Sequence, residues 1–373
     1  MEDNPQHFLD LIRRSRRGRF KVYIGMIAGV GKTYRMLQDA RAMLHCGTDV
    51  QIGYVETHGR ADTVKALKGL PVIPRKKIFY KGKEIEEMDL DAILQIHPEI
   101  VIVDELAHSN VEGCRHAKRW QDVMELLEAG VSVLSAVNIQ HIESLNDEVR
   151  SIVGIDVKER IPDLVLREAD EVVNIDLTAG ELVDRLKAGK IYAKEKIQTA
   201  LDNFFKTENI LQLRELALKE VAFRVGKKVE SEVAPVENKG RGQAKLLVCV
   251  SSNSETQQHI IRKAVRLADF HGAELVALYV QTPKEHNDRI PLDTQRHLMG
   301  HLELVVQLGG RIRQVVSDNI TQTIIDICHE ERITTLCMGQ PSLTLPRLLT
   351  RTRAYRKLLL ELKAMGIDLI IFA

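Results

Sequence analysis

The 373-residue chain carries 53 Lys and Arg against 52 Asp and Glu, a formal net charge of +1, and 44% of its residues are hydrophobic. This balance excludes a mostly disordered chain and gives no overall attraction to nucleic acid or anionic membranes. Five scattered cysteines without a C-x-x-C pair favour a reducing compartment over a zinc or redox site. The sequence shows neither a signal peptide nor an apolar run of about 18 residues, so we expect a cytoplasmic chain with no membrane span. The near-zero net charge leads us to expect no nucleic-acid partner.

The chain begins with a basic arm, residues 1–17, and its cationic side chains are either simply solvated or in contact with phosphates, a membrane or an acidic partner. Residues 18–225 then alternate short β-branched runs with longer helical patterns, which is typical of α/β folds with parallel sheets. Strands are expected at 20–24, 50–55, 100–103, 131–137 and 171–175, and a helical tail at 178–225.

A glycine-rich segment follows the first expected strand and opens a helix. It reads Gly25-Met-Ile-Ala-Gly-Val-Gly-Lys-Thr33 and ends in the G-x-G-K-T pattern of a P-loop. Such a loop points backbone N–H groups at phosphates, while Lys32 neutralises the β- and γ-phosphates and the Thr33 hydroxyl ligates Mg²⁺. The sequence therefore predicts a P-loop NTPase-type domain that binds a nucleoside triphosphate with Mg²⁺.

The loop departs from the usual spacing at one position. The first glycine is expected five residues before Gly31, where this chain has Met26, and Gly25 lies one residue upstream. An altered first turn would weaken nucleotide binding. The alternative is a glycine-rich turn that binds nothing.

Four apolar residues at 100–103 precede Asp104 and Glu105, a Walker B pattern. Asp104 is the candidate that holds Mg²⁺ through its water shell, and Glu105 is the candidate catalytic residue that orients an attacking water. The alternative is a buried strand that ends in acidic turn residues. The expected nucleotide-binding residues are Gly29, Val30, Gly31, Lys32, Thr33 and Asp104, with Thr33 and Asp104 as the Mg²⁺ site.

Three further groups of residues could either contact the nucleotide or have a purely structural role. Asn138 or His141, after the next strand, could sense the γ-phosphate, and His58 and Arg60 follow the second strand in a similar place. A solvated basic face is the favoured interpretation of the cations that flank the single tryptophan, Trp120. These cations are Arg115, His116, Lys118 and Arg119.

Residues 226–243 are charged, punctuated by Gly and Pro, and predicted to be a linker. A second α/β series follows over residues 244–373. Five strands are expected at 245–250, 274–280, 312–316, 334–338 and 368–372, with helices between them.

Several strings in the first domain resemble the N-terminal sensor region of KdpD, the sensor-kinase family that controls the bacterial high-affinity Kdp potassium-uptake system. The matching segments are 29–33, 56–60, 103–109, 116–123, 137–147, 169–173, 189–192 and 203–205. The second domain is similar to the five-stranded universal-stress-protein domain of that family. The resemblance implies ATP as the nucleotide.

The sequence ends at Ala373 without the membrane helices and histidine-kinase core that follow in these sensor kinases. It resembles the free-standing short KdpD-like proteins of some bacteria. We therefore expect action on a separate partner, a histidine kinase, a response regulator or a Kdp transporter component, and homodimer formation stays open.

In the second domain, only Gly339 fits the glycine loop of ATP-binding stress proteins, so ATP is not expected there. Resemblance to KdpD stress domains implies cyclic di-AMP as a ligand, with Ser252, Ser254, Ala277 and Tyr279 at matching positions. Leu275 and Val276 depart from that pattern. The alternative is an ordinary turn beside a buried strand tyrosine.

Three functions are weighed. The leading one is a regulatory switch, in which nucleotide occupancy changes partner binding. The competing one is an enzyme with independent turnover, an ATPase or a small-molecule kinase, for which no acceptor site is recognisable. The third is a structural scaffold with a vestigial P-loop.

Overall fold

The computed structural model of the chain describes residues 16–233, 244–251, 256–283, 291–340 and 348–372. The chain forms two compact units, one built on residues up to 231 and the other on residues from 232 onward, with residues 162–164 grouped with the second. Each unit contains its own five-stranded sheet in which all neighbouring strands are parallel. The predicted α/β class with parallel sheets is therefore confirmed.

The strands of the first sheet are β1 (Phe20–Gly25), β2 (Val50–Tyr54), β5 (Ile100–Val103), β6 (Ser132–Asn138) and β7 (Glu171–Ile175). Their order is β2-β5-β6-β1-β7. Both faces of this sheet are buried: Phe20 and Val22 of β1 pack on one side and Tyr23 on the other. This explains why the strands read as apolar runs without polar alternation.

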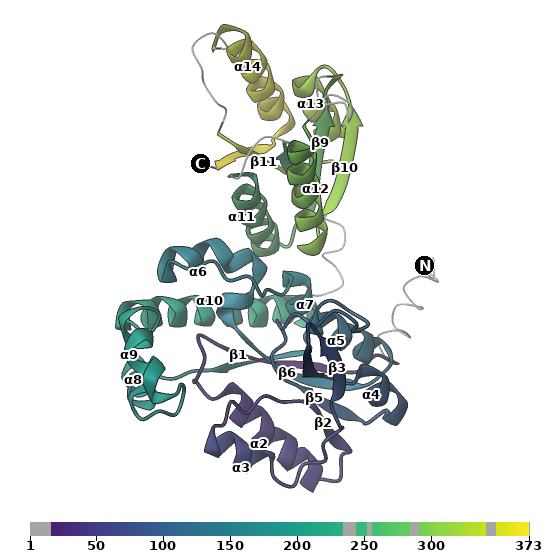
Figure 1. Cartoon of the computed structure of the whole chain (residues 1–373). Helices are drawn as coiled ribbons and strands as arrows, with labels where there is room; N and C mark the ends of the chain where they lie inside the picture. Colours follow the sequence, from purple (N-terminus) through teal and green to yellow (C-terminus); the bar gives the residue numbers. More distant parts are fainter. Residues whose placement is uncertain (1–15, 234–243, 252–255, 284–290, 341–347, 373) are drawn as a thin grey trace. The chain divides into compact units, whose positions relative to one another are not determined.

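Helices cover both faces of the first sheet (Figure 1). The helices of this unit are α2 (Lys32–His45), α3 (Ala61–Leu67), α4 (Leu90–Ile96), α5 (Arg119–Glu128), α6 (Asn146–Val153), α7 (Asp163–Arg167), α8 (Ala179–Lys187), α9 (Lys194–Asp202) and α10 (Thr207–Val233), with short 3₁₀ turns at Ile139–His141 and Glu143–Leu145. Apolar residues of α2 and α3 pack on the face that carries Tyr23, and those of α5 and α10 pack on the opposite face.

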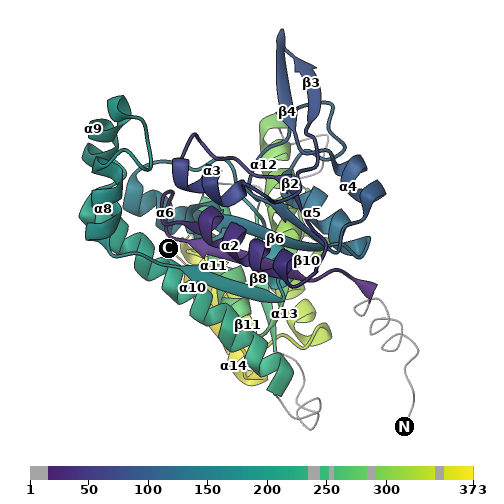
Figure 2. The same ribbon diagram turned by 90° about the horizontal axis from the view of Figure 1, so that it is seen from below.

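A β-hairpin stands apart from the main sheet. Its strands are β3 (Lys76–Tyr80) and β4 (Lys83–Glu87), which pair antiparallel with each other and project away from the sheet in Figure 2. Most of its side chains are exposed, but Glu87 at its base is buried. This hairpin was not predicted from the sequence.

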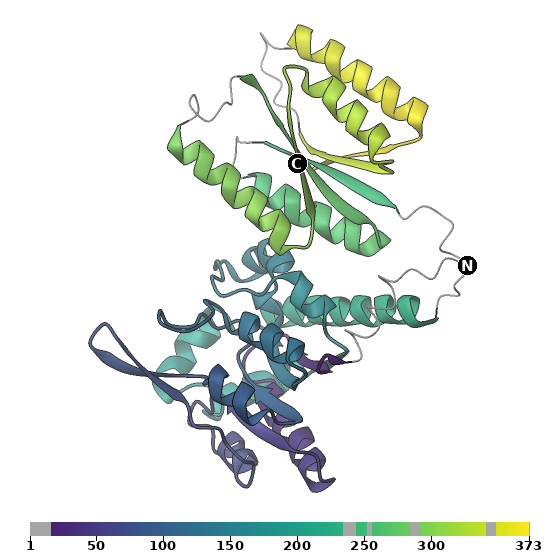
Figure 3. The same cartoon turned by 90° about the vertical axis from the view of Figure 1, so that its right-hand side faces the viewer.

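The second unit has the strand order β10-β9-β8-β11-β12. Two helices pack on each face of its sheet, α11 with α12 and α13 with α14 (Figure 3). Its elements are β8 (Lys245–Val250), α11 (Thr256–His271), β9 (Glu274–Gln281), α12 (Leu292–Gln307), β10 (Arg311–Val316), α13 (Ile320–Glu330), β11 (Thr335–Gly339), α14 (Leu348–Met365) and β12 (Asp368–Phe372).

Helix α10 extends beyond the expected end of the first domain. It continues through Val233 and so occupies the first part of the segment 226–243 that was predicted to be a linker. Lys and Glu are good helix formers, and one glycine is tolerated in a long helix. Residues 234–243 lie outside the described residues. None of the helices in the described ranges combines the length and apolar character that crossing a bilayer requires.

Candidate functional site

The loop between β1 and α2 presents an open helix N-terminus. Gly29 and Gly31 have φ values of 90° and 104°, the left-handed region that glycine adopts without strain. Gly31 is the N-cap of α2, no side chain caps this end, and the first turn carries no acidic residue. The first N–H groups of α2 therefore have no side-chain acceptor and can bind an anion.

Met26 does not distort this loop. Its φ is not positive, and its side chain is buried in the core at 1% exposure, so the position does not require glycine. Gly25 is the position that cannot carry a side chain, because an added Cβ would lie 2.5 Å from Val30 Cγ2 and 3.1 Å from Lys32 Cδ. The glycine one residue upstream is thus required for the loop to close over Lys32.

Lys32, the first residue of α2, extends beneath the loop. Its ammonium group donates to Asn138 Oδ1 and lies 3.5 Å from the Ile27 carbonyl oxygen. Withdrawal from solvent lowers the pKa of Lys32 to about 8, with a further decrease from Arg60 and an opposing increase from Asp104. Withdrawal from solvent destabilises the charged form of Lys32, so an anion beside the ammonium group would be bound favourably.

The Thr33 hydroxyl donates to Asp104 Oδ2 at 2.8 Å. A hydroxyl has one proton and two lone pairs, so Thr33 can keep this bond and still offer oxygen to a cation. Asp104 is 5% exposed, and burial raises its pKa although the bonds from Thr33 and the Glu105 amide lower it. The positive charge of a divalent cation would offset the cost of burying the charged Asp104 carboxylate, so Thr33 and Asp104 fit the chemistry of Mg²⁺. The described residues contain no cluster of three His, Cys, Asp or Glu that could hold a metal ion. A Mg²⁺ ion here would therefore depend on Thr33, phosphate oxygens and water.

Glu105 has a φ of 55°, a left-handed conformation that is unusual for a residue with a side chain. Its carboxylate lies 3.3 Å from His58 Nε2 and 3.7 Å from Arg119 Nη1. The hydrogen bond from His58 lowers the pKa of Glu105, and the same bond raises the pKa of His58. The candidate catalytic carboxylate therefore lies between the His58 ring and the Arg119 guanidinium, and the bond from His58 favours its ionised form.

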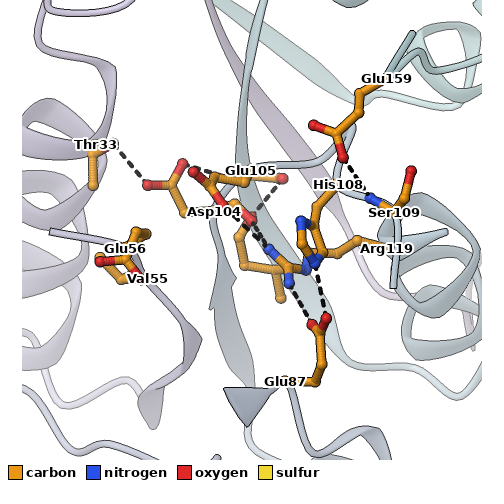
Figure 4. Close-up of polar contacts among 12 residues, drawn as sticks. Thr33, Val55, Glu56, Glu87, Asp104, Glu105, His108, Ser109, Arg119 and Glu159 are labelled. Atoms are coloured by element: carbon orange, nitrogen blue, oxygen red, sulfur yellow. Dashed lines mark hydrogen bonds and ion pairs between the residues drawn. The ribbon is translucent and has the colours of Figure 1, made fainter. Parts of the chain in front are cut away.

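Arg119 corrects the predicted solvated basic face. It is fully buried, with Nη2 2.9 Å from Glu87 Oε2 and Nη1 3.4 Å from the Asp104 carbonyl oxygen. Its guanidinium carbon lies 3.7 Å from the centre of the Tyr54 ring, and His108 also contacts Glu87 at 2.9 Å. Figure 4 shows Arg119, Glu87 and His108 beside Asp104 and Glu105. No pattern in the sequence pointed to it, because Glu87 lies in the hairpin that was not predicted.

One cavity of about 780 Å³ brings the predicted site residues together. Gly29, Val30, Gly31, Lys32, Thr33, Asp104 and Glu105 all line it. It also contains cations from distant parts of the chain, Arg60, Arg185 and Lys190, of which the last two were not predicted. The strand order explains the convergence, since β6 lies between β1 and β5 and all three end at the same edge.

Asn138 and His141 both line this cavity, in different roles. Asn138 ends β6 opposite Gly25 of β1 and contacts Lys32 directly. His141 donates from Nδ1 to the Glu159 carbonyl oxygen at 2.7 Å, and burial lowers its pKa. Of the two residues, Asn138 is therefore the one that contacts Lys32, while burial favours the neutral form of His141.

The predicted cyclic di-AMP residues divide differently. Ser252 and Ser254 lie outside the described residues. Ala277 and Tyr279, on β9, are 0% and 2% exposed and belong to the core of the second unit. This position matches the alternative of a buried strand tyrosine, and the ligand assignment stays a prediction.

Comparison with known families identifies the first unit. A family model described as KdpD, "Osmosensitive K+ channel His kinase sensor domain", matches residues 16–225. The chain belongs to this family.

Curated KdpD relatives extend the similarity over most of the chain. The putative sensor protein KdpD of Synechocystis sp. is 42% identical over 328 residues, which cover 87% of this chain and 86% of that protein. The sensor protein KdpD of Escherichia coli is 39% identical over 344 residues, but the chain spans only 38% of its length. Among solved structures, the universal stress protein from Archaeoglobus fulgidus is 14% identical, and the match covers 35% of this chain and 98% of that one with a TM-score of 0.28.

Proposed function

We propose that this KdpD-family chain binds ATP with Mg²⁺ through a P-loop NTPase-type site and uses nucleotide occupancy to regulate a signalling partner. The observation that carries this proposal is the joint placement of an uncapped helix N-terminus, Lys32 and the Thr33–Asp104 pair in one cavity. Each is a separate requirement of Mg²⁺–triphosphate binding.

The roles follow from the geometry. The backbone from Gly29 to Gly31 and the first turn of α2 receive the phosphates, and Lys32 balances their charge. Thr33 ligates Mg²⁺, and Asp104 fixes the Thr33 hydroxyl. When bound, Mg²⁺ supplies positive charge to the phosphate oxygens. Asn138 shares its amide oxygen with Lys32, so it registers any displacement of that ammonium group.

The state of Glu105 favours a switch over an enzyme with rapid turnover. A general base works best when its pKa lies near the working pH. The pKa of Glu105 is instead lowered by His58, which leaves a weakly basic carboxylate between His58 and Arg119. Glu105 can orient a water, but we expect turnover well below about one per second.

The family membership points to potassium-uptake signalling. Relatives that match most of the chain are called sensor protein KdpD, and the matching family model describes a histidine-kinase sensor domain. We propose that the partner is a histidine kinase, a response regulator or a Kdp transporter component, and that it binds one nucleotide state better than the other. Only such a difference in affinity can produce a switch.

The test is calorimetric titration of ATP–Mg²⁺ into the wild type, Lys32→Ala and Lys68→Ala. Lys68 is an exposed lysine outside the cavity, so its variant controls for the loss of one positive charge. We expect micromolar binding by the wild type and by Lys68→Ala, and a loss of at least tenfold in Lys32→Ala. Equal binding by all three proteins would contradict the proposal.

Two further measurements separate the alternatives. Phosphate release faster than about one per second would favour the ATPase or small-molecule kinase. Titration with cyclic di-AMP tests the second unit, with Tyr279→Phe as the variant. Heat from cyclic di-AMP that is unchanged in Lys32→Ala would assign that ligand to a site outside the cavity.

A further inference from the structure

Among the cationic side chains that line the cavity are Lys32 and Arg60, which have no carboxylate partner in the described part of the chain. Lys32 contacts the Asn138 amide oxygen and the Ile27 carbonyl, and Arg60 donates from Nη2 to the Ile191 carbonyl oxygen at 3.3 Å. Within the described residues neither forms an ion pair. Arg60 contributes to the lowered pKa of Lys32, so the two charges are close enough to repel each other.

Arg60 has unused hydrogen-bonding capacity in this position. Its Nε is buried and has no hydrogen-bond partner in the described part of the chain. Burial lowers the pKa of Arg60, while the charges of Asp104 and Glu105 raise it. A guanidinium has five N–H donors and binds phosphate oxygens in pairs. An anion between Lys32 and Arg60 would use the free donors and remove the repulsion.

A local turn fixes this placement. His58 and Gly59 both have positive φ, 48° and 71°, and the Arg60 amide donates to the Thr57 carbonyl at 2.9 Å. Arg60 then becomes the N-cap of α3. The turn therefore holds the Arg60 side chain in the cavity and places His58 beside Glu105.

The neighbours of Arg60 indicate which phosphate it faces. Lys32 serves the β- and γ-phosphates in a P-loop, and the Walker B carboxylates lie at the terminal end, where Mg²⁺ and the attacking water belong. Arg60 lines the same cavity as Lys32, Asp104 and Glu105. We propose that Arg60 binds the terminal phosphate and makes the site distinguish ATP from ADP, an inference that rests on the proposed nucleotide site.

Arg60 now donates to the carbonyl oxygen of Ile191, a residue that packs against the glycine loop. Ile191 lies in the segment 188–193 between α8 and α9, and its side chain covers Gly29, where an added Cβ would lie 2.4 Å from Ile191 Cδ1. A terminal phosphate that uses the free donors of Arg60, Nε among them, leaves the Nη2 bond to the Ile191 carbonyl in place. Triphosphate binding would therefore connect segment 188–193 to the phosphate through Arg60, and diphosphate binding would not.

The experiment compares ATP–Mg²⁺ and ADP–Mg²⁺ by calorimetry on the full chain. The variants are Arg60→Gln, Arg60→Lys and, as a matched control, Arg115→Gln, which removes an arginine that pairs with Asp91 and Glu125 outside the cavity. We expect Arg60→Gln to weaken ATP binding by about ten- to a hundredfold and ADP binding by less than about threefold. Arg60→Lys should recover part of the ATP affinity, and Arg115→Gln should match the wild type.

The outcomes are separable. Equal weakening of ATP and ADP in Arg60→Gln, or no weakening of either, overturns the role of Arg60 while the nucleotide site stands. A wild type that binds neither nucleotide overturns the nucleotide site and this inference with it. Thermal unfolding of each variant identifies a misfolded protein, and if Arg60→Gln is misfolded, a loss of ATP preference in a folded Arg60→Lys carries the test.

Discussion

The Thr33 hydroxyl and the Asp104 carboxylate are joined by a 2.8 Å hydrogen bond across 71 positions of sequence. Thr33 lies in the first turn of the helix after the glycine loop and Asp104 follows the apolar strand β5, so the bond connects the two halves of the candidate Mg²⁺ site. We expect both residues to be needed for Mg²⁺ binding, since removing a residue that orients a metal ligand typically lowers metal affinity by about 10- to 100-fold.

The first prediction concerns magnesium dependence. Asp104→Asn should reduce the gain in ATP affinity that Mg²⁺ provides by about ten- to a hundredfold, because the amide no longer carries the charge that fixes Thr33 and attracts the cation. Titrations with Mg²⁺ and with EDTA measure this gain. The exposed variant Asp91→Asn is the control, and an Asp104→Asn protein with an undiminished Mg²⁺ effect would contradict the assignment.

The second prediction concerns pH. Lys32 has a pKa of about 8, and its protonated form binds phosphate, so ATP affinity should fall as the pH rises through 8. Between pH 7 and pH 9 the expected loss is about tenfold. Lys32→Arg stays charged throughout this range and should show a flat profile, whatever its absolute affinity. A wild-type profile that is equally flat would show that Lys32 does not titrate in the site.

The third prediction concerns the His58–Glu105 pair. The pKa of His58 is raised from 6.5 by Glu105, so the pair stabilises the fold fully below pH 6.5 and loses this contribution as the pH rises through the folded pKa. In an NMR titration of the ring signals, Glu105→Gln should lower the pKa of His58 toward 6.5. The remaining histidine signals provide the internal control. No change in the His58 pKa would mean that the 3.3 Å contact does not persist in solution.

The fourth prediction concerns Arg119. Arg119→Met leaves the buried Glu87 without its fully buried cationic partner and should lower the free energy of unfolding of the first unit by about 3–5 kcal/mol. Trp120 is the single tryptophan and packs against the core of this unit, so its fluorescence follows that transition alone.

Two comparisons make the Arg119 measurement specific. The double variant Glu87→Gln/Arg119→Met should lose less than the sum of the two single losses, because the unpaired charge is gone. Arg115→Gln, on the surface, should change the unfolding free energy by less than about 1 kcal/mol. If Arg119→Met also lowered the unfolding free energy by less than about 1 kcal/mol, the hydrogen bond with His108 would be sufficient to stabilise the buried Glu87 carboxylate.

The central strands of the sheets could be read from the sequence because they are buried on both faces. The run at 100–103 is apolar at every position and matches β5 as predicted. Hairpin β3–β4 escaped prediction because strands such as Lys76–Tyr80 are short, largely exposed and rich in lysine. Because the hairpin was not predicted, Glu87 was not recognised as the partner of Arg119. Sequence spacing alone does not reveal a buried ion pair between residues 32 positions apart.

The candidate phosphate loop was the part of the candidate site most accessible to sequence reasoning, because a G-x-G-K-T string between a strand and a helix is typical of phosphate-binding loops. The effect of Met26 was less accessible. Whether that position needs a left-handed backbone depends on the path of the chain, and here Gly29 and Gly31 take the positive φ values instead.

Met26, Ile27 and Val30 are each exposed by 3% or less, so three side chains of the phosphate loop belong to the hydrophobic core. A loop anchored in this way keeps its shape through packing, with no need for a bound anion to organise it. The conformational entropy of ordering these residues is lost when the chain folds and not when nucleotide arrives. The site is in this sense preorganised, and occupancy can be set by nucleotide concentration with little rearrangement of the loop itself.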